Sequence, residues 1–187
     1  PNPKWNARTA AYYEKLLAQK TFDFGVFSYS MPGDNEPENV ASTREKLRAE
    51  TSRLEAVFGR PFDIMPTYSH IAWYSSKMEF PSTLAGEFAG GDGFNSKPVL
   101  QFTYQFTTNN NNVSSYNSTQ CQTPMFDILR GVYDEDFRKL ASAIKAYGYP
   151  VLFRLNNEMN TDWTSYCGMM TLCDPEIFVL TWRYLYD

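Results

Sequence analysis

One short segment of the chain contains residue types that could carry acid–base chemistry. The segment VLFRLNNEMNTDW, residues 151–163, starts as an apolar strand and then places Asn157 and Glu158 at its end. A carboxyl group at the end of an apolar strand, with aromatic side chains around it, is partly desolvated, and desolvation favours its protonated form. A general acid must hold a proton near neutral pH. Glu158 is therefore the candidate catalytic residue.

The residues around Glu158 suit the binding of a sugar. Asn157 could form an amide hydrogen bond with a substrate hydroxyl, and Arg154 supplies a permanent cation that could orient a second carboxylate or keep it ionised. Trp163 and Tyr166 offer flat faces on which a pyranose ring could stack. The alternative interpretation is structural: Arg154 and Glu158 form an ion pair, and the Trp163 side chain fills the interior of the loop. Residue types alone slightly favour this structural interpretation.

The order of elements along the chain places the segment where ligands bind. Apolar spacing and capping residues predict strands and helices in alternation. The expected helices cover residues 5–19, 42–59, 134–148 and 174–187, and the expected strands lie at 22–30, within 61–73, at 99–106 and from Pro150 onward. Such alternation favours a parallel sheet covered by helices, with ligands beyond the carboxyl ends of the strands. Asn157 and Glu158 occupy such a strand end.

Four strand–helix units correspond to half of a (β/α)8 barrel, the TIM barrel. A complete barrel takes roughly 250 residues. The 187 residues are therefore expected to form a single α/β domain, residues 1–187, that is the first half of such a barrel. A shorter doubly wound sheet is the alternative architecture. No G-x-G-x-x-G or P-loop motif follows any expected strand, which argues against nucleotide binding.

Composition and charge argue against several classes of function. The net charge is −4 and Lys and Arg do not cluster, so nucleic-acid binding is not expected. No apolar run approaches the roughly 18 residues that a membrane span requires, so no membrane partner is expected. The first residues lack the apolar core of a signal peptide, which is absent or already removed. Aromatic residues make up 17% of the chain, which fits an aromatic core or a cleft for a ligand with flat faces.

The chain offers few metal ligands. His70 is the single histidine and no C-x-x-C motif occurs, so neither a zinc site nor another cofactor is expected. His70, within TYSHIAW, is interpreted as a polar strand-end residue that could contact substrate rather than as a catalyst. Cys167 and Cys173 are close in sequence, while Cys121 lies far upstream. A disulfide between the first two and free buried thiols are both compatible with this spacing.

Two segments, PVLFRLNNEMNTDWTSYCG and DPEIFVLTWRYLYD, carry a family resemblance. Together they resemble glycoside hydrolase family 26, the retaining β-mannanases and related β-glucanases and xylanases. That family belongs to the large clan of (β/α)8 glycosidases with an Arg on strand four and a Glu at the end of that strand. The positions that match the family pattern are Arg154, Glu158, Trp163, Gly168, Phe178, Trp182 and Arg183.

The sequence departs from the family pattern at three places. Leu155 stands where the family has Pro, and Asn157 stands where it has His, although Asn-Glu is the commoner pair across the wider clan. Gln105 lies near the end of the third expected strand, where mannan-active members often have His. Gln105 is therefore a further candidate substrate-binding residue. These departures bear on whether the substrate is mannan more than on whether the chain has glycosidase chemistry.

The resemblance implies a secreted, retaining endo-β-glycosidase whose partner is a β-linked polysaccharide or oligosaccharide, either mannan or a related glucan or xylan. Glu158 would be its general acid/base. The nucleophile, about 5 to 5.5 Å away, would come from a seventh strand in the C-terminal half of the barrel. Glu79 and Glu87 are the upstream candidates for a second carboxylate, and the isolated chain is expected to be inactive. The alternatives are a non-catalytic carbohydrate-binding or scaffold barrel and an unrelated α/β protein.

Overall fold

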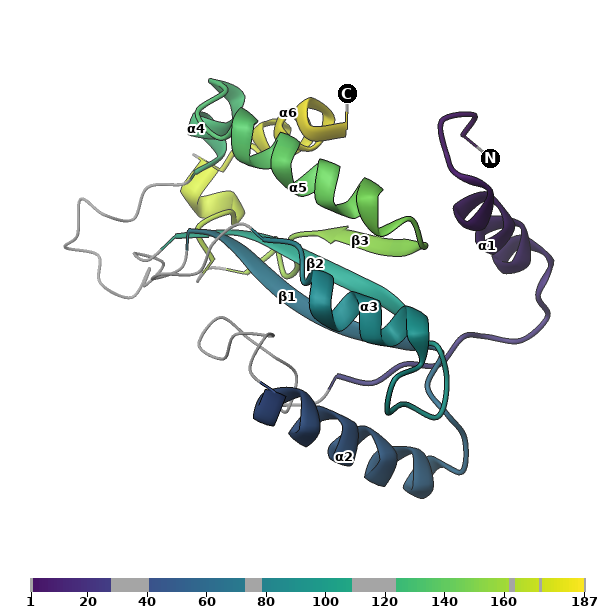
Figure 1. The fold of residues 1–187 in the computed structure, drawn as a ribbon. Helices are drawn as coiled ribbons and strands as arrows, with labels where there is room; N and C mark the ends of the chain where they lie inside the picture. Colours follow the sequence, from purple (N-terminus) through teal and green to yellow (C-terminus); the bar gives the residue numbers. More distant parts are fainter. Residues whose placement is uncertain are drawn as a thin grey trace. The chain divides into compact units, whose positions relative to one another are not determined.

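The computed structural model of the protein describes residues 2–27, 41–72, 79–108, 124–161, 164–171 and 173–186 (Figure 1). The chain divides into two compact units, and each strand continues from one unit into the other. Unit 1 contains Pro1–Thr67, Phe80–Phe102 and Ala143–Phe153, and unit 2 contains Tyr68–Glu79, Thr103–Ser142 and Arg154–Asp187.

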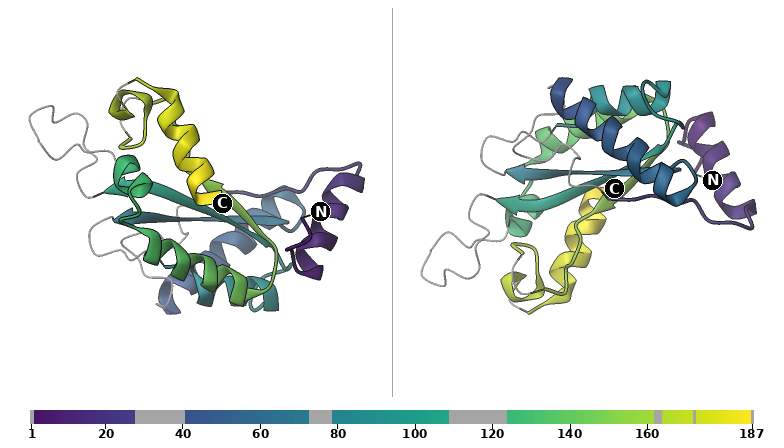
Figure 2. Two further views of the ribbon diagram at one scale, coloured as in Figure 1. Left: turned by 90° about the horizontal axis from the view of Figure 1, so that it is seen from above. Right: turned by 90° about the horizontal axis from the view of Figure 1, so that it is seen from below.

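Three parallel strands form a sheet in the order β1-β2-β3 (Figure 2). The strands are β1, Ile64–Ala72, β2, Val99–Thr108, and β3, Val151–Leu155. Helix α3 lies between β1 and β2 in the sequence, and helices α4 and α5 lie between β2 and β3. A parallel sheet whose strands are linked through helices is the architecture that the alternating pattern predicts. The α/β class is therefore confirmed.

The four helices expected from the sequence are present with nearly the expected bounds. They are α1, Ala7–Ala18, α2, Ala41–Phe58, α5, Asp134–Tyr147, and α6, Pro175–Tyr186. Helix α1 begins after Asn6, whose Oδ1 accepts a hydrogen bond from the backbone N of Thr9 at 2.9 Å. Helix α6 begins after Asp174, whose Oδ1 accepts from the backbone N of Glu176 at 3.0 Å. Both contacts satisfy backbone donors that a helix start leaves open.

A helix that the sequence analysis did not predict connects β1 to β2. This helix, α3, covers Ser82–Gly90 and contains Gly86 as well as the terminal glycine. Each glycine inside a helix costs about 1 kcal/mol relative to alanine, so the local sequence favours a loop. Three buried side chains offset this cost, namely Leu84, Ala85 and Phe88. Packing of an apolar face, rather than propensity, determines the helix.

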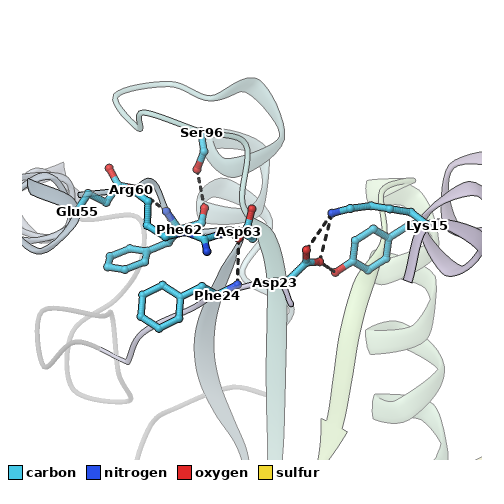
Figure 3. A network of polar contacts seen from close by, with 9 residues as sticks. Lys15, Asp23, Phe24, Glu55, Arg60, Phe62, Asp63 and Ser96 are labelled. Carbon is cyan, nitrogen blue, oxygen red and sulfur yellow. Dashed lines mark hydrogen bonds and ion pairs between the residues drawn. The ribbon is translucent and has the colours of Figure 1, made fainter. Parts of the chain in front are cut away.

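The strand expected at residues 22–30 is reduced to one parallel bridge, between Gly25 and Ile64. The expectation is wrong for residues 22–27, and residues 28–30 lie outside the described part. The backbone O of Phe24 accepts hydrogen bonds from the N atoms of Asp63 and Ile64, at 2.7 and 3.3 Å. The N of Phe24 donates to Asp63 Oδ2 at 3.0 Å (Figure 3). These contacts hold the segment beside the start of β1 at one point.

Substituting Gly25 by Ala is expected to destabilise the fold. A Cβ atom on Gly25 would lie 2.5 Å from the backbone O of Ile64, and relieving such overpacking costs about 1–3 kcal/mol. A Cβ on Gly86 of α3 meets no atom within 4 Å, so Gly86→Ala is expected to stabilise by up to about 1 kcal/mol through helix propensity. Urea unfolding of both variants measures the two changes. Equal stability of the two variants would contradict the close approach at Gly25.

Unit 1 has an apolar core with polar contacts at its periphery (Figure 3). The buried apolar side chains include Leu47, Phe62, Met65, Leu84, Phe88, Leu100 and Phe102. At the periphery, Asp23 accepts a hydrogen bond from the Tyr12 hydroxyl at 3.1 Å and forms an ion pair with Lys15. These contacts tie α1, none of whose side chains is buried, to the segment around Gly25 that pairs with β1.

Unit 2 has an aromatic core around β2. Its buried side chains include Tyr104, Phe106, Met125, Ile128, Leu140 and Tyr166. Phe137 of α5 meets the rings of Tyr104 and Phe106 edge-on, with centroids 5.9 and 6.3 Å apart. The short helix α4, Met125–Leu129, packs against α6, and the 3₁₀ helix η1 covers Gly168–Thr171. Part of the aromatic surplus therefore lies in the core.

Candidate functional site

The chain turns sharply where β3 ends. The backbone N of Asn156 donates to Tyr104 O at 2.8 Å, and Asn156 Oδ1 accepts from the backbone N of Phe106, also at 2.8 Å. The side chain of Asn156 thus continues the pairing of β3 with β2 by one step. Asn156 and Glu158 both adopt left-handed backbone conformations, with φ of 58° and 51°. This conformation is tolerated by Asn but costs about 1–2 kcal/mol for most other residues, and such strain gathers at functional sites.

Three of the predicted substrate-binding residues meet beside this turn and form what we call the amide–phenol cluster, namely Gln105, Asn157 and Tyr166. Gln105 Nε2 donates to Asn157 Oδ1 at 2.5 Å and to the Tyr166 hydroxyl at 3.1 Å. The Tyr166 hydroxyl in turn donates to Asn157 Oδ1 at 3.3 Å. Because Asn157 Oδ1 accepts from two buried neighbours, the plane of the Asn157 amide is fixed. Among the described residues, Asn157 Nδ2 donates to no partner, and Asn157 is partly exposed.

The structure corrects the expected role of Tyr166. The Tyr166 side chain is 1% exposed, so its ring offers no open face on which a sugar could stack. The reason is that its hydroxyl is anchored inward, on Gln105 and Asn157. The pKa of Tyr166 is raised, chiefly by burial and less by the nearby charge of Glu158, while hydrogen bonds with the Gln105 side chain and the Asn157 backbone and the charge of Arg154 lower it. The hydroxyl therefore stays protonated and continues to donate at neutral pH.

Arg154 is held by residues of β1 and β2. Its Nε donates to Thr103 Oγ1 at 3.0 Å, and its Nη2 donates to the Tyr68 hydroxyl at 2.9 Å. Its guanidinium carbon lies 5.5 Å from the centre of the Tyr68 ring. Within the described part of the chain, Arg154 and Glu158 form no ion pair. The structural ion pair considered for these two residues is therefore not formed.

Glu158 lies in the turn after β3, beyond Asn156 and Asn157, as expected, but its side chain is exposed. Its backbone O accepts hydrogen bonds from the N of Thr161 at 3.1 Å and from Thr161 Oγ1 at 2.8 Å. The partly desolvated carboxyl that the sequence predicts is therefore not observed among the described residues. The apolar strand before Glu158 determines where the carboxyl lies, whereas its burial depends on neighbours from other segments. Trp163, the expected stacking residue, lies outside the described part.

The remaining candidates are His70, Glu87 and Glu79. His70 is a partly buried residue of β1, the strand that pairs with β2, on which Gln105 of the amide–phenol cluster lies. Glu87 lies in α3 and forms ion pairs with Arg44 at 2.6 Å and with Arg48 at 2.8 Å, which gives it a structural role. Glu79 is exposed and precedes α3. Neither glutamate lies at the end of a described strand.

Unit 2 contains a cavity of about 380 Å³ beside the segment that follows β3. Its described walls come from the segment after Glu158, from Tyr166, from η1 and from the start of α6. Cys173 lies on this wall as an exposed free thiol, and Cys167 is a buried free thiol. The local disulfide considered for these two residues is therefore not formed. Cys121 lies outside the described part.

Sequence reasoning missed the residues that position the predicted ones. Tyr68 and Thr103 hold Arg154, and Asn156 fixes the turn before Asn157. The doublet Asn156-Asn157 directly after an apolar strand was the available signal, because Asn favours tight turns. Tyr68 and Thr103 give no such signal, since their contact with Arg154 depends on how the strands align.

Replacing Tyr166 by Phe is expected to change the alkaline limit of stability. A tyrosine whose pKa is raised in the folded state stabilises the fold below about pH 10, and this contribution is lost as pH rises toward the folded-state pKa. Tyr166→Phe removes this loss, so the variant should lose less stability than the wild type between pH 8 and 11. At pH 8 it should be less stable by about 1 kcal/mol, since it removes the hydrogen bonds of the buried Tyr166 hydroxyl with Gln105 and Asn157. Urea midpoints at both pH values test this, and equal losses would contradict it.

Comparisons of the sequence with models of known protein families and with curated proteins find no match. Within the described ranges, no three His, Cys, Asp or Glu side chains gather as metal ligands. No helix in the described part is both long and apolar enough to cross a lipid bilayer. The fold and the site define the chain as an α/β protein with a polar strand-end site.

Proposed function

We propose that residues 1–187 are part of a retaining endo-β-glycosidase with a (β/α)8 architecture, similar to glycoside hydrolase family 26. The observation that carries the proposal is the strand end itself. Asn157 and Glu158 lie in the turn that follows a parallel strand, and the Asn157 amide is held by Gln105 and Tyr166, while its Nδ2 has no partner among the described residues. Ligands of parallel α/β folds bind at this end of the strands.

The order of the strands favours a barrel over a doubly wound sheet. Gly25 pairs in parallel with Ile64 of β1, and the sheet then continues β1-β2-β3. Neighbours in the sheet are therefore neighbours in the sequence. A doubly wound sheet reverses its strand order at a switch point, whereas the strands of a barrel follow one another in sequence order. On this basis Gly25 marks the first barrel strand and β3 is the fourth.

The chemistry assigned to Glu158 is that of the general acid/base in a double displacement. Glu158 protonates the glycosidic oxygen as the bond to the anomeric carbon breaks, and later takes a proton from the water that attacks the same carbon. Asn157 Nδ2 donates to a hydroxyl oxygen of the sugar. Arg154, held by Tyr68 and Thr103, supplies a fixed positive charge beside the site. The proposal places the nucleophile on a later strand, about 5 to 5.5 Å from Glu158.

The proposed substrate is a β-linked polysaccharide outside the cell, and this proposal includes secretion of the protein. Mannan, mixed-linkage glucan and xylan are the candidates. The exposed side chain of Glu158 is compatible with such a substrate, because a long chain must enter the site from the side. The proposal involves no cofactor.

Binding of oligosaccharides tests the assignment of Asn157. Mannohexaose, a mixed-linkage glucan hexamer and xylohexaose are titrated by calorimetry into the wild type, Asn157→Ala and Asn160→Ala. One of the three should bind, and Asn157→Ala should weaken its binding by about tenfold, the loss expected for one hydrogen bond of 1–1.5 kcal/mol. Asn160 is exposed and lies outside the amide–phenol cluster, so its variant should bind as the wild type does. Equal effects of the two substitutions would contradict the assignment.

A second candidate function is carbohydrate binding without cleavage. The observation that favours it is the exposure of Glu158, because a general acid is normally surrounded by groups that favour its protonated form. Under this alternative, Asn157→Ala weakens binding, whereas no protein that contains the chain releases reducing ends from the glycan that it binds. Release of reducing ends by the wild type excludes this alternative.

A further inference from the structure

The cavity that follows the strand end is large enough to hold a small molecule. Its volume of about 380 Å³ lies within the range of ligand sites. Met159, Pro175 and Phe178 form the apolar part of its wall. None of the described residues that line it is charged. These residues would therefore offer a charged ligand no opposite charge in exchange for its lost hydration.

The hydroxyl groups on the cavity wall are already engaged within the protein. Thr161 Oγ1 donates to Glu158 O at 2.8 Å, and Thr171 Oγ1 donates to Gly168 O at 3.1 Å. The Tyr166 hydroxyl belongs to the amide–phenol cluster. The protons of all three hydroxyls are therefore unavailable to a ligand. A pyranose in this cavity would bury several hydroxyls without partners, which is unfavourable.

One amide on the wall has no partner of its own. The exposed side chain of Asn160 forms no hydrogen bond within the described part of the chain, and it lines the cavity. It can donate to or accept from one polar group of a ligand. The cavity thus combines apolar walls with one open polar group, as is common in small-molecule sites.

We propose that this cavity binds an uncharged ligand that has one flat apolar ring and a single hydrogen-bonding group, the class of small aromatic alcohols and amides. The ring contacts Phe178 and Met159, and the polar group bonds to Asn160. The site differs from the sugar position assigned at Asn157, and it does not depend on the proposed glycosidase function.

Indole is a suitable probe, because it is neutral, flat and has one polar group. Its binding to the complete chain is measured by calorimetry for the wild type, Gly168→Leu and Gly86→Leu. A Cβ on either glycine meets no atom within 4 Å, but only Gly168 lines the cavity. Gly168→Leu should raise the Kd of indole by about tenfold or more, and Gly86→Leu should leave it within about twofold. No binding of indole to the wild type, or equal Kd values for both variants, would overturn the proposal.

The thiol of Cys173 provides a second readout that does not require a cavity variant. Cys173 is exposed and lines the cavity, whereas Cys167 is buried. In protein carrying Cys121→Ser, indole at ten times its Kd should slow the alkylation of Cys173 by iodoacetamide by about tenfold, in proportion to the free fraction. Benzoate and methyl β-glucopyranoside should give no protection at the same concentration. An unchanged rate with indole, or protection by the glucoside, would overturn the proposal.

Discussion

Replacing Glu158 by Ala should lower the rate of β-glycan hydrolysis by about 10²–10⁴-fold, the usual contribution of a positioned general acid. The rate is measured as reducing ends released from the preferred glycan by a protein that contains residues 1–187 together with the proposed nucleophile strand. The loss should appear in kcat and not in KM, because Glu158 acts on the breaking bond and its exposed side chain contributes little to packing.

Two further variants separate acid–base chemistry from a general effect of charge. Glu158→Gln keeps the size of the side chain but has no proton to transfer, so its loss should equal that of the alanine variant within about threefold. Glu135→Ala removes another exposed carboxylate, on α5, whose partner is Lys139 four residues later. It should leave the rate unchanged. If Glu158→Ala retains most of the wild-type rate, Glu158 is not the acid/base.

Replacing Phe106 by Ala should destabilise the protein by about 3–5 kcal/mol, the range observed for large-to-small changes of buried aromatic residues. The side chain of Phe106 is 1% exposed and meets the rings of Tyr104 and Phe137 edge-on. Its removal leaves a cavity in the core of unit 2 and loosens the end of β2, where the backbone N of Phe106 contacts the side chain of Asn156.

The matched control for this prediction is Phe22→Ala. Phe22 is 72% exposed, so its truncation removes little buried surface and should change stability by less than about 0.5 kcal/mol. Chemical unfolding of both variants gives the two values. A loss below 1 kcal/mol for Phe106→Ala would show that the core of unit 2 is not packed as described.

The sequence predicted those elements whose own residues determine them. Helix α5 was predictable because its apolar side chains recur at helical spacing after three acidic residues in the first turn. Helix α3 was not, because its glycines favour a loop and its stability comes from the burial of Leu84 and Phe88. The segment around Gly25 has a strand-like pattern, yet the structure pairs it with β1 at a single bridge.

The candidate site was predictable only in part. An apolar strand followed by polar residues indicated where Asn157 and Glu158 lie, since residues that follow a parallel strand lie at the edge of the sheet where ligands bind in folds of this class. The amide–phenol cluster joins residues 52 and 61 positions apart, and such contacts depend on the alignment of strands and loops. For the same reason the sequence did not indicate that Tyr166 is buried or that Glu158 is exposed.

Chemical rescue by azide tests the role of Glu158 most directly. An aryl β-glycoside with a good leaving group needs no general acid, so the Glu158→Ala variant should still form the covalent glycosyl–enzyme. Because the variant lacks a base to activate water, hydrolysis of this intermediate should be slow. Azide attacks without a base. Azide should accelerate turnover by Glu158→Ala but not by the wild type, with a β-glycosyl azide as the product. An unchanged rate of the variant in azide, with no glycosyl azide formed, would contradict it.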